Sequence, residues 1–302
     1  MKMLKLQFLG TLVLMMCMVI PAMAQTANSL VLTFSVDPST TYNDGTVRYS
    51  LILTNQNIPG ANPATVDITF SPPGPTGANG AFGTQVTLDT SITIPVGTEV
   101  VYNYDGSDGA IARPVLEVDL GAVPLNPGVT VAYAQAGFDG IYNASPEYNA
   151  IDSRTVPVTV ISPDTLVNIS TSAAQVVSGG TVDLTVTEQN TGDDPLDSPY
   201  VEVSPGGYTL NKASTYYVSG DTNGDGILDT TETWTWIITG VVVNADTTFT
   251  AIGHGTDSLG NDITYDPGPP EVYPGEKATV DVDAISPDTL VNISTSAAQV
   301  VS

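Results

Sequence analysis

Cysteine, histidine and basic residues are scarce in this chain, and each scarcity narrows what the protein can be. The 302 residues include one cysteine, Cys17, and one histidine, His254. One cysteine cannot form an internal disulfide, and a zinc site built from cysteine and histidine ligands is disfavoured. Lys and Arg total 7 against 32 Asp and Glu. Such an acidic surface repels nucleic acid and anionic lipid and attracts cations, so we expect no nucleic-acid partner, although the acidity also serves solubility alone.

A long apolar run occurs at the N-terminus, which has the pattern of a targeting segment. Residues 1–24 begin with two lysines, continue as a mostly apolar run and end in the small-x-small motif Ala22–Ala24. This pattern predicts a signal peptide, with Gln25 as the first residue of a secreted or cell-surface chain. Lipoprotein processing at Cys17 is the alternative, disfavoured because the bulky Met16 precedes it. No later segment is long and apolar enough to span a membrane, so we expect no membrane span.

Period-two alternation dominates from residue 25 onward and predicts strands. The segment Gly45–Asn55, "GTVRYSLILTN", places Val47, Tyr49, Leu51 and Leu53 on one face. Glycine, proline and asparagine clusters such as "SPPGPTGANG" separate such runs and indicate turns. Short strands with one apolar face predict an all-β fold of antiparallel sandwich domains. Two further runs show the same alternation: Val66, Ile68 and Phe70, and Leu116, Val118 and Leu120.

A long internal repeat sets the expected domain boundaries. The stretch "ISPDTLVNISTSAAQVVS" occurs at Ile161–Ser178 and again at Ile285–Ser302. A period this long indicates an array of similar domains. We therefore expect a β-sandwich domain at residues 25–160, a second at 161–284, and the first strand region of a third repeat at 285–302. The Ser-Pro joint at each boundary is short and stiff, which predicts a semi-rigid rod.

The final 18 residues allow two interpretations, because a single strand cannot bury its apolar face alone. In the first, the chain is a fragment of a longer array. In the second, the segment adds to a sheet edge of a neighbouring copy, and the protein self-associates by strand exchange. The second domain already has an identical strand, which a donated copy would have to displace.

The strongest chemical motif is "DTNGDGILDTTE", residues 221–232, which fits a twelve-residue calcium loop. Its oxygen-bearing positions match those that wrap a hard cation needing six to eight oxygens, and Gly226 allows the sharp turn at position six. The flanking segments "YYVSG" and "TWTWII" alternate like strands, so we expect a structural calcium between strands instead of a helical switch. An acidic turn without a metal is the alternative. The candidate ligands are Asp221, Asn223, Asp225, Ile227, Asp229 and Glu232.

This loop belongs to a wider resemblance. The segments "GGTVDLTVTEQNTG", "YYVSGDTNGDGILDTTETWTW" and "GHGTDSLGND" resemble the immunoglobulin-like repeat domain of archaeal and bacterial cell-surface proteins, of the S-layer-like and adhesin types. The resemblance covers nearly all of the second domain. The first domain is a diverged copy of the second, because Gly45–Asn55 aligns without a gap on Gly180–Asn190. The resemblance covers the first domain only in outline, because "DTNGDG" has no good counterpart there. It implies tandem β-sandwiches at the cell surface, where cell-envelope proteins or glycans are the partners, and it implies no enzyme activity.

The remaining candidates carry weaker signals. Trp234 and Trp236 share one face of a strand and form either a sandwich core or a sugar-stacking platform; the core interpretation is favoured because aromatic pairs dominate such cores. His254 has no identifiable nucleophile with an orienting acid, so catalysis would have to lie in a part of the protein beyond this sequence. Three sequons would accept N-glycans in an exported chain: Asn168, Asn292 and, less favourably because Pro146 follows it, Asn143.

Overall fold

The computed structural model describes residues 30–57, 62–102, 111–114, 116–123, 125–143 and 148–292. The predicted signal peptide lies outside these ranges, as does most of the segment expected to open a third repeat. Regular structure in the described residues consists of strands and one short 3₁₀ helix, η1 (Pro274–Glu276). The all-β class predicted from the alternation is confirmed.

The first half of the described chain forms a unit with two sheets. In one sheet the strand order is β1-β3-β6-β7, and β8 also pairs with β3. In the other sheet the order is β2-β10-β9-β4-β5. The strands are β1 (Leu30–Asp37), β2 (Thr40–Tyr42), β3 (Thr46–Asn55), β4 (Ala64–Ser71), β5 (Val86–Ile94), β6 (Glu99–Tyr102), β7 (Ile111–Arg113), β8 (Leu116–Asp119), β9 (Val131–Tyr142) and β10 (Tyr148–Ile161).

The second half forms a similar unit. One sheet has the order β11-β13-β18-β16, and the other has β12-β21-β19-β14-β15, with β17 on β14 and β20 on β19. The strands are β11 (Thr165–Thr171), β12 (Gln175–Val177), β13 (Gly180–Asn190), β14 (Leu196–Ser204), β15 (Tyr208–Leu210), β16 (Tyr217–Ser219), β17 (Ile227–Leu228), β18 (Thr233–Val243), β19 (Thr247–Thr256), β20 (Asp262–Thr264) and β21 (Lys277–Ile285).

Each unit has its own apolar core, built from the inward faces that the alternation predicted. On β3, Val47, Tyr49, Leu51 and Leu53 are each 0% exposed. The run on β4 is equally well buried, whereas Leu116 and Val118 on β8 are only half-buried against the core. The two clusters share no residue, so each unit is stabilised by its own packing.

The two units have corresponding strands. In both, a short early strand pairs in parallel with the last strand: β2 with β10, and β12 with β21. In both, the first strand pairs antiparallel with the third, so that Leu30 lies opposite Asn55 and Thr165 opposite Asn190. Asn55 and Asn190 are both buried and donate their side-chain amides to backbone carbonyls. These shared details support the alignment of Gly45–Asn55 on Gly180–Asn190.

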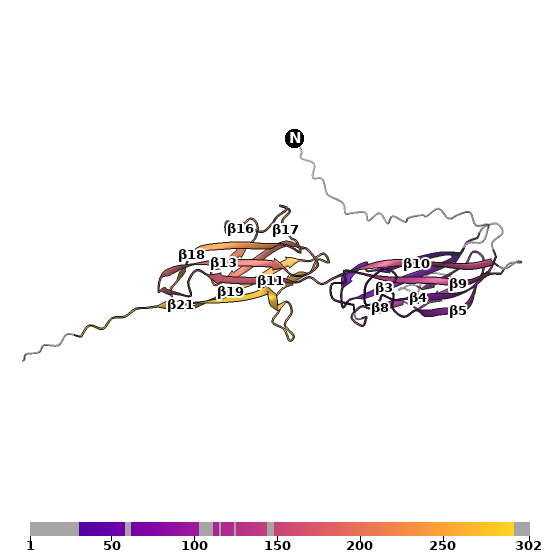
Figure 1. The fold of residues 1–302 in the computed structure, drawn as a ribbon, viewed down its shortest axis with the longest axis horizontal. Coiled ribbons are helices and arrows are strands. Elements are labelled where there is room, and N and C mark those ends of the chain that lie inside the picture. The colour runs from indigo at the N-terminus through magenta and orange to yellow at the C-terminus, as the bar shows by residue number, and fades with distance from the viewer. Residues whose placement is uncertain are drawn as a thin grey trace, which may run out of the picture.

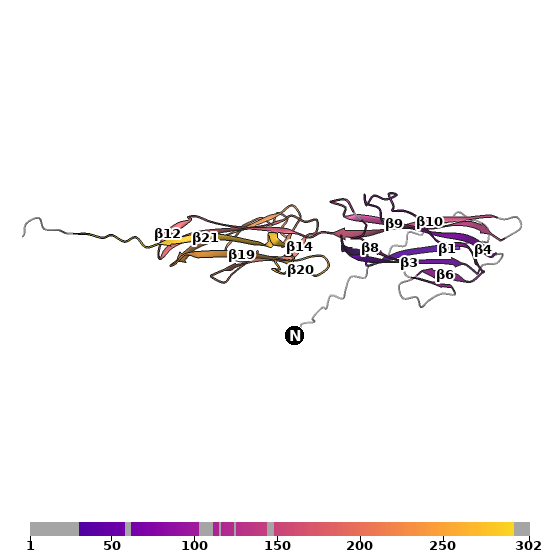
Figure 2. The ribbon, with the colours of Figure 1, turned by 90° about the horizontal axis from the view of Figure 1, so that it is seen from below.

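The two units lie end to end, and a short connection joins them (Figures 1 and 2). Only residues 162–164 separate the end of β10 from the start of β11. The N–H of Ser162 donates to Asp193 at 2.6 Å, and the N–H groups of Thr191 and Gly192 donate to the carbonyl of Asp164. The connection is therefore bound to the second unit along its length. Among the described residues, no helix has the length and apolarity to cross a membrane.

One side chain of the first unit also contacts the second directly. The Tyr42 hydroxyl donates to the carboxylate of Asp257 and accepts from Asn261 Nδ2 at 2.7 Å. Burial, followed by the Asp257 carboxylate, raises the pKa of Tyr42 to about 12, so the hydroxyl remains a donor at physiological pH. Both hydrogen bonds lie at the joint, so they restrain its angle.

Replacing Tyr42 by phenylalanine is expected to loosen this joint without unfolding either unit. A hydrogen bond to a charged group contributes about 1.5–3 kcal/mol, and this variant removes it while keeping the ring. We expect a broader distribution of end-to-end distances, measured by single-molecule energy transfer between dyes on the two units. The melting temperature should be unchanged within about 1–2 °C. An unchanged distance distribution would mean that the connection alone sets the angle.

Candidate metal centre

The acidic loop lies between two strands of the second unit. Strand β16 precedes it and β18 follows it, and the two strands pair with each other. Within the loop, β17 pairs with β14, with Ile227 opposite Asp197. No helix flanks the loop, as the alternation of the neighbouring segments predicted. Both ends and the middle of the loop are therefore attached to sheet backbone.

Asp221 organises the first turn of the loop. Its side chain is 1% exposed and accepts the N–H groups of Gly224 at 2.6 Å and Gly226 at 2.9 Å. Both glycines have φ near +85°, a conformation that side-chain-bearing residues rarely adopt. The N–H of Asp221 donates in turn to the Tyr217 hydroxyl. The glycines therefore curl the chain around the Asp221 carboxylate.

Three of the predicted ligands lie together on the exposed side of the loop. Asn223 Oδ1 accepts the N–H of Asp225, and Asp225 Oδ1 accepts the N–H of Ile227. These local bonds are the turns that Asn and Asp form with their own backbone. The Asn223 amide nitrogen donates to both Asp225 Oδ2 and Asp229 Oδ2, each at 2.9 Å. An amide N–H₂ group therefore lies between two carboxylates, in a position where a cation would satisfy them.

A lysine that the motif does not include contacts the first ligand position. The Lys212 ammonium donates to Asp221 Oδ2 and forms an ion pair with it. This bond holds the pKa of Asp221 below its ordinary value and raises that of Lys212. The chain thus supplies its own cation to a loop carboxylate whose side chain is almost fully covered.

Glu232 is buried and fully used by protein donors. Its Oε1 accepts the N–H of Thr222 at 2.6 Å and the Thr222 hydroxyl at 2.7 Å. Its Oε2 accepts Trp234 Nε1 at 3.1 Å and the N–H of Asp229 at 3.4 Å. Burial acts to raise the pKa of this carboxyl, but these donors outweigh it and hold the pKa below the ordinary value. Glu232 therefore closes the loop as an ionised carboxylate.

The six predicted ligands fit calcium in chemistry and only partly in geometry. All of them offer oxygen, which is what calcium prefers. Asn223, Asp225 and Asp229 converge, whereas Asp221 and Glu232 face protein donors and Ile227 lies in a strand pair. In the described part of the chain, no three acidic, histidine or cysteine side chains are close enough together to hold a metal. Calcium binding would require the Asn223 amide to turn and Lys212 to leave Asp221.

Sequence reasoning missed Lys212 and Thr222, which contact two of the six positions. Thr222 lies within the motif, but its position is not a ligand position. Lys212 precedes the loop by nine residues, and no spacing rule connects it to the motif. The one available signal is its rarity, because it is one of 7 basic residues in the chain.

The two tryptophans belong to the core. Trp234 and Trp236 on β18 are 1% and 0% exposed. Their ring centroids lie 6.1 Å apart, and the Tyr217 ring packs edge-on against both. Buried rings cannot stack on a sugar from solution. The core interpretation, favoured by the sequence, is the one the structure supports.

His254 lies on β19 beside an acidic residue. Its Nδ1 is 3.0 Å from Asp262 Oδ2, and its ring stacks on Tyr200 with centroids 4.5 Å apart. The stacking and the carboxylate account for both the position and the orientation of the ring.

The three sequon asparagines are exposed. Asn168 lies on an outward position of β11, and Asn143 lies just after β9, where its amide donates to Thr65. Asn292 is the last described residue. Each would be reachable by a glycosylation enzyme in an exported chain.

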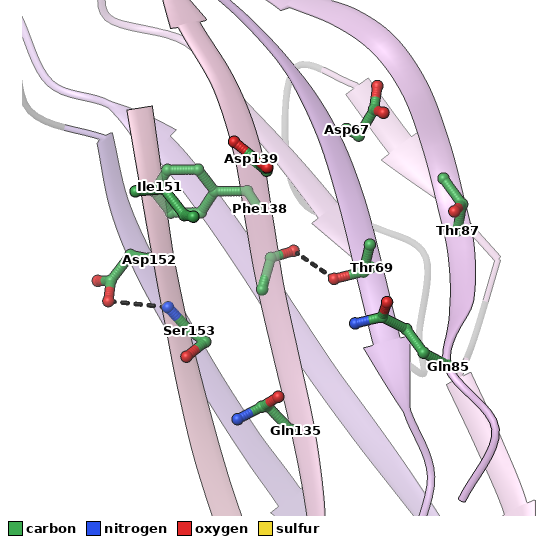
Figure 3. Close-up of a pocket in the computed structure, with 11 residues that line it drawn as sticks. Asp67, Thr69, Gln85, Thr87, Gln135, Phe138, Asp139, Ile151, Asp152 and Ser153 are labelled. Carbon is green, nitrogen blue, oxygen red and sulfur yellow. Dashed lines mark hydrogen bonds between the residues drawn. The ribbon is translucent and has the colours of Figure 1, made fainter. Parts of the chain in front are cut away.

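A polar hollow of about 490 Å³ lies on the outer face of the first unit, over β4, β9 and β10 (Figure 3). Gly137 leaves space in its floor, and Thr69 donates to the Gly137 carbonyl at 3.3 Å. Carboxylates from Asp67, Asp139 and Asp152 border it. Phe138 is the one aromatic residue in its lining, and it is only 4% exposed. The hollow therefore offers hydrogen-bonding groups without a stacking platform.

No family model matches the chain, and no curated protein is similar to it by sequence. The resemblance to cell-surface repeat domains thus stays a prediction.

Proposed function

We propose that the protein is a non-catalytic, extracellular repeat protein that spaces or displays components of the cell envelope. In this proposal the two sandwich units are immunoglobulin-like beads of a semi-rigid rod, and other envelope proteins or glycans are its partners. The N-terminal segment, residues 1–24, would direct the chain out of the cell.

The observation that carries the proposal is the joint between the units. A connection of residues 162–164, hydrogen-bonded to the second unit and braced by Tyr42, favours a fixed separation of the two ends. A binding protein needs an exposed site, whereas a spacer needs length and stiffness. The burial of both tryptophans supports the spacer, since it removes the best candidate for a glycan platform.

Structural calcium would add stiffness to the second unit. The oxygens of Asp221, Asn223, Asp225, Asp229 and Glu232 and the carbonyl of Ile227 would hold it. The ion would cross-link the loop where Lys212 and the Asn223 amide now neutralise the carboxylates.

Calcium is expected to raise the melting temperature of the second unit. Extracellular calcium modules bind with dissociation constants of about 10⁻⁴–10⁻³ M. At about 10 mM calcium, such a site stabilises the folded state by about 1.4–2.7 kcal/mol. For a unit of this size that corresponds to roughly 5–15 °C. The measurement is a thermal melt followed by tryptophan fluorescence, with calcium and with a chelator.

Two variants test whether the loop is the calcium site. The first is the double variant Asp225→Asn with Asp229→Asn, and the second is Lys212→Met. The first removes two carboxylates while keeping side-chain size, and it should reduce the calcium-induced shift. The second removes the competing ammonium, and it should strengthen calcium binding several-fold, because like charges near a cation site oppose binding. Equal shifts in all three proteins would rule out the loop as the site.

The location is tested by fractionation of the source cells with an antibody against the second unit. The proposal expects the protein in the envelope or the medium, with an N-terminus at Gln25. Recovery of the intact chain, including residues 1–24, from the cytoplasm would contradict it. A glycan array with the purified protein tests the alternative binding function, for which the hollow in Figure 3 is the candidate surface.

A further inference from the structure

The core of the second unit contains two buried carboxylates and a buried hydroxyl that are not part of the acidic loop. Glu188 on β13 and Glu276 in η1 are both 0% exposed. Among the residues that the structure describes, none is a hydrogen-bond partner for any of their four buried carboxylate oxygens or for the hydroxyl of Thr165 on β11. Buried polar atoms are almost always satisfied in folded proteins, so five unsatisfied oxygens in one core require an explanation.

The two carboxylates point into the same space, beside Gly253 on β19. A Cβ atom built on Gly253 would overlap Glu276 Oε2 and would lie 3.1 Å from Glu188 Oε1. The same Cβ would also touch Val167, the cross-strand partner of Glu188. Thr165 is the next inward residue of β11 before Val167. The absence of a side chain at residue 253 thus makes room in which both carboxylates meet.

The first unit has apolar side chains at the same places. The strand registers match Leu53 with Glu188, because each lies two residues before its buried asparagine. They match Leu30 with Thr165 through the same strand pair. They also match Phe138 with Gly253, because the last strand of the first unit, β10, pairs with β9 as the last strand of the second unit, β21, pairs with β19. The second unit therefore has a hydroxyl, a carboxylate and a gap where the first has two leucines and a phenylalanine, all of them buried.

The surroundings of this carboxylate pair are acidic. Burial raises the pKa of Glu188 well above its ordinary value, and Glu276 raises it further. Burial raises the pKa of Glu276 to about 8, with Asp164 and Asp262 adding to the effect. Carboxylates that are buried without donors are strongly destabilising unless a proton or a cation neutralises them.

The basic residues that adjoin Glu276 and Gly253 in sequence are engaged elsewhere. Lys277 directly follows Glu276, but its ammonium lies 4.5 Å from the centre of the Tyr265 ring. His254 directly follows Gly253, but its ring nitrogen contacts Asp262. Within the described part of the chain, neither of these two side chains neutralises the pair.

We propose that Glu188, Glu276 and Thr165 bind one hard divalent cation of the calcium class inside the second unit, separate from the loop at residues 221–232. The chemistry favours a metal ion over protonation. Protonation of both carboxyls would neutralise them but would add only one donor to each, whereas one calcium ion accepts six to eight oxygen ligands and can bind all five oxygens together. Two carboxylates balance a divalent charge, and backbone or water oxygens would complete the shell.

The test uses the mature chain with its loop disabled by Asp225→Asn and Asp229→Asn. Bound calcium is counted per chain by equilibrium dialysis, and terbium is used as a luminescent substitute. Glu188 lies opposite Trp234 in the β13–β18 pair, so terbium at this site would be sensitised by tryptophan excitation. We expect one calcium per chain. Adding Glu188→Gln and Glu276→Gln should abolish it and lower the luminescence at least tenfold.

A second variant distinguishes loss of the metal ligands from misfolding of the unit. Glu188→Leu inserts the residue that the first unit has at the matching place, so the core should fold, as a thermal melt would report. It too should bind no calcium once the loop is disabled. Retention of the ion in the Glu188→Leu or the double glutamine chain would overturn the proposed ligands.

The outcomes also distinguish calcium binding at the buried site from calcium binding in the loop at residues 221–232. If the unmodified chain binds one calcium and the loop-disabled chain binds none, the loop site stands and the buried site is wrong. If the loop-disabled chain shows neither bound calcium nor sensitised terbium emission, protons neutralise the pair and the proposal fails. One ion in the loop-disabled chain and the same single ion in the unmodified chain would support the buried site and refute the loop.

Discussion

Replacing Trp236 by alanine is expected to lower the free energy of unfolding of the second unit by about 3–5 kcal/mol. The side chain is 0% exposed and contacts the rings of Trp234 and Tyr217. Its indole nitrogen also donates to the carbonyl of Asn211 at 3.0 Å, so truncation leaves a cavity and an unpaired carbonyl. Domains are stable by only about 5–15 kcal/mol, so this loss is a large share of the total.

The measurement is denaturant unfolding followed by the fluorescence of the remaining tryptophan. The chain has 2 tryptophans, both on β18, so their emission reports the second unit alone. Val242 on the same strand is 56% exposed and is the matched control, for which alanine should change stability by no more than about 0.5 kcal/mol. Similar losses for both variants would mean that Trp236 does not support the core.

Replacing Leu53 by glutamate is expected to destabilise the first unit more severely than any surface change. Leu53 is 0% exposed on β3, between Leu32 on β1 and Val100 on β6. Glutamate is the residue that the second unit has at the matching position, Glu188. The first unit lacks the polar neighbours that surround Glu188 in the second unit. A carboxyl in this position has no partner and costs at least about 3 kcal/mol, either as a buried charge or through the proton it must take up.

Hydrogen exchange of residues 30–57, read by mass spectrometry, measures this effect, because the first unit has no tryptophan. The control is Leu53→Met, which keeps the volume and should cost less than about 1.5 kcal/mol. We expect loss of exchange protection in the glutamate variant, while the second unit keeps its fluorescence-detected stability. Full protection in the glutamate chain would show that this position tolerates a carboxyl without metal or partner.

The strands and the core faces were predictable because alternation has a direct physical cause. Successive residues of a strand point to opposite faces, so Val47, Tyr49, Leu51 and Leu53 must share one side. The same rule placed Trp234 and Trp236 together, and the prevalence of aromatic pairs in sandwich cores favoured their burial. The acidic loop was recognisable because its ligand positions lie within one continuous stretch of sequence.

Features that depend on contacts between distant segments were not predictable. Lys212 reaches Asp221 only because the chain folds back before β16. Tyr42 meets Asp257 and Asn261 only when two units are placed end to end. Glu276 enters the core from η1, far along the chain from Glu188. The alternation of β13 does place Glu188 inward, but only the fold shows that no described residue donates a hydrogen bond to its carboxylate.

The parallel pairing of β2 with β10, and of β12 with β21, determines how each unit would respond to tension. An early strand and the exit strand of the same unit lie in register over three residues, Thr40 to Tyr42 against Thr159 to Ile161 in the first unit. Once a pull on the two ends of a unit has passed through its first strand, β1 or β11, it acts along this pair in opposite directions. The load is therefore a shear that all of its hydrogen bonds share, instead of a peeling force that opens them one by one. Forced unfolding is governed by the unfolding rate and not by equilibrium stability. These short clamps thus give each bead a resistance to stretching that a thermal melt does not report.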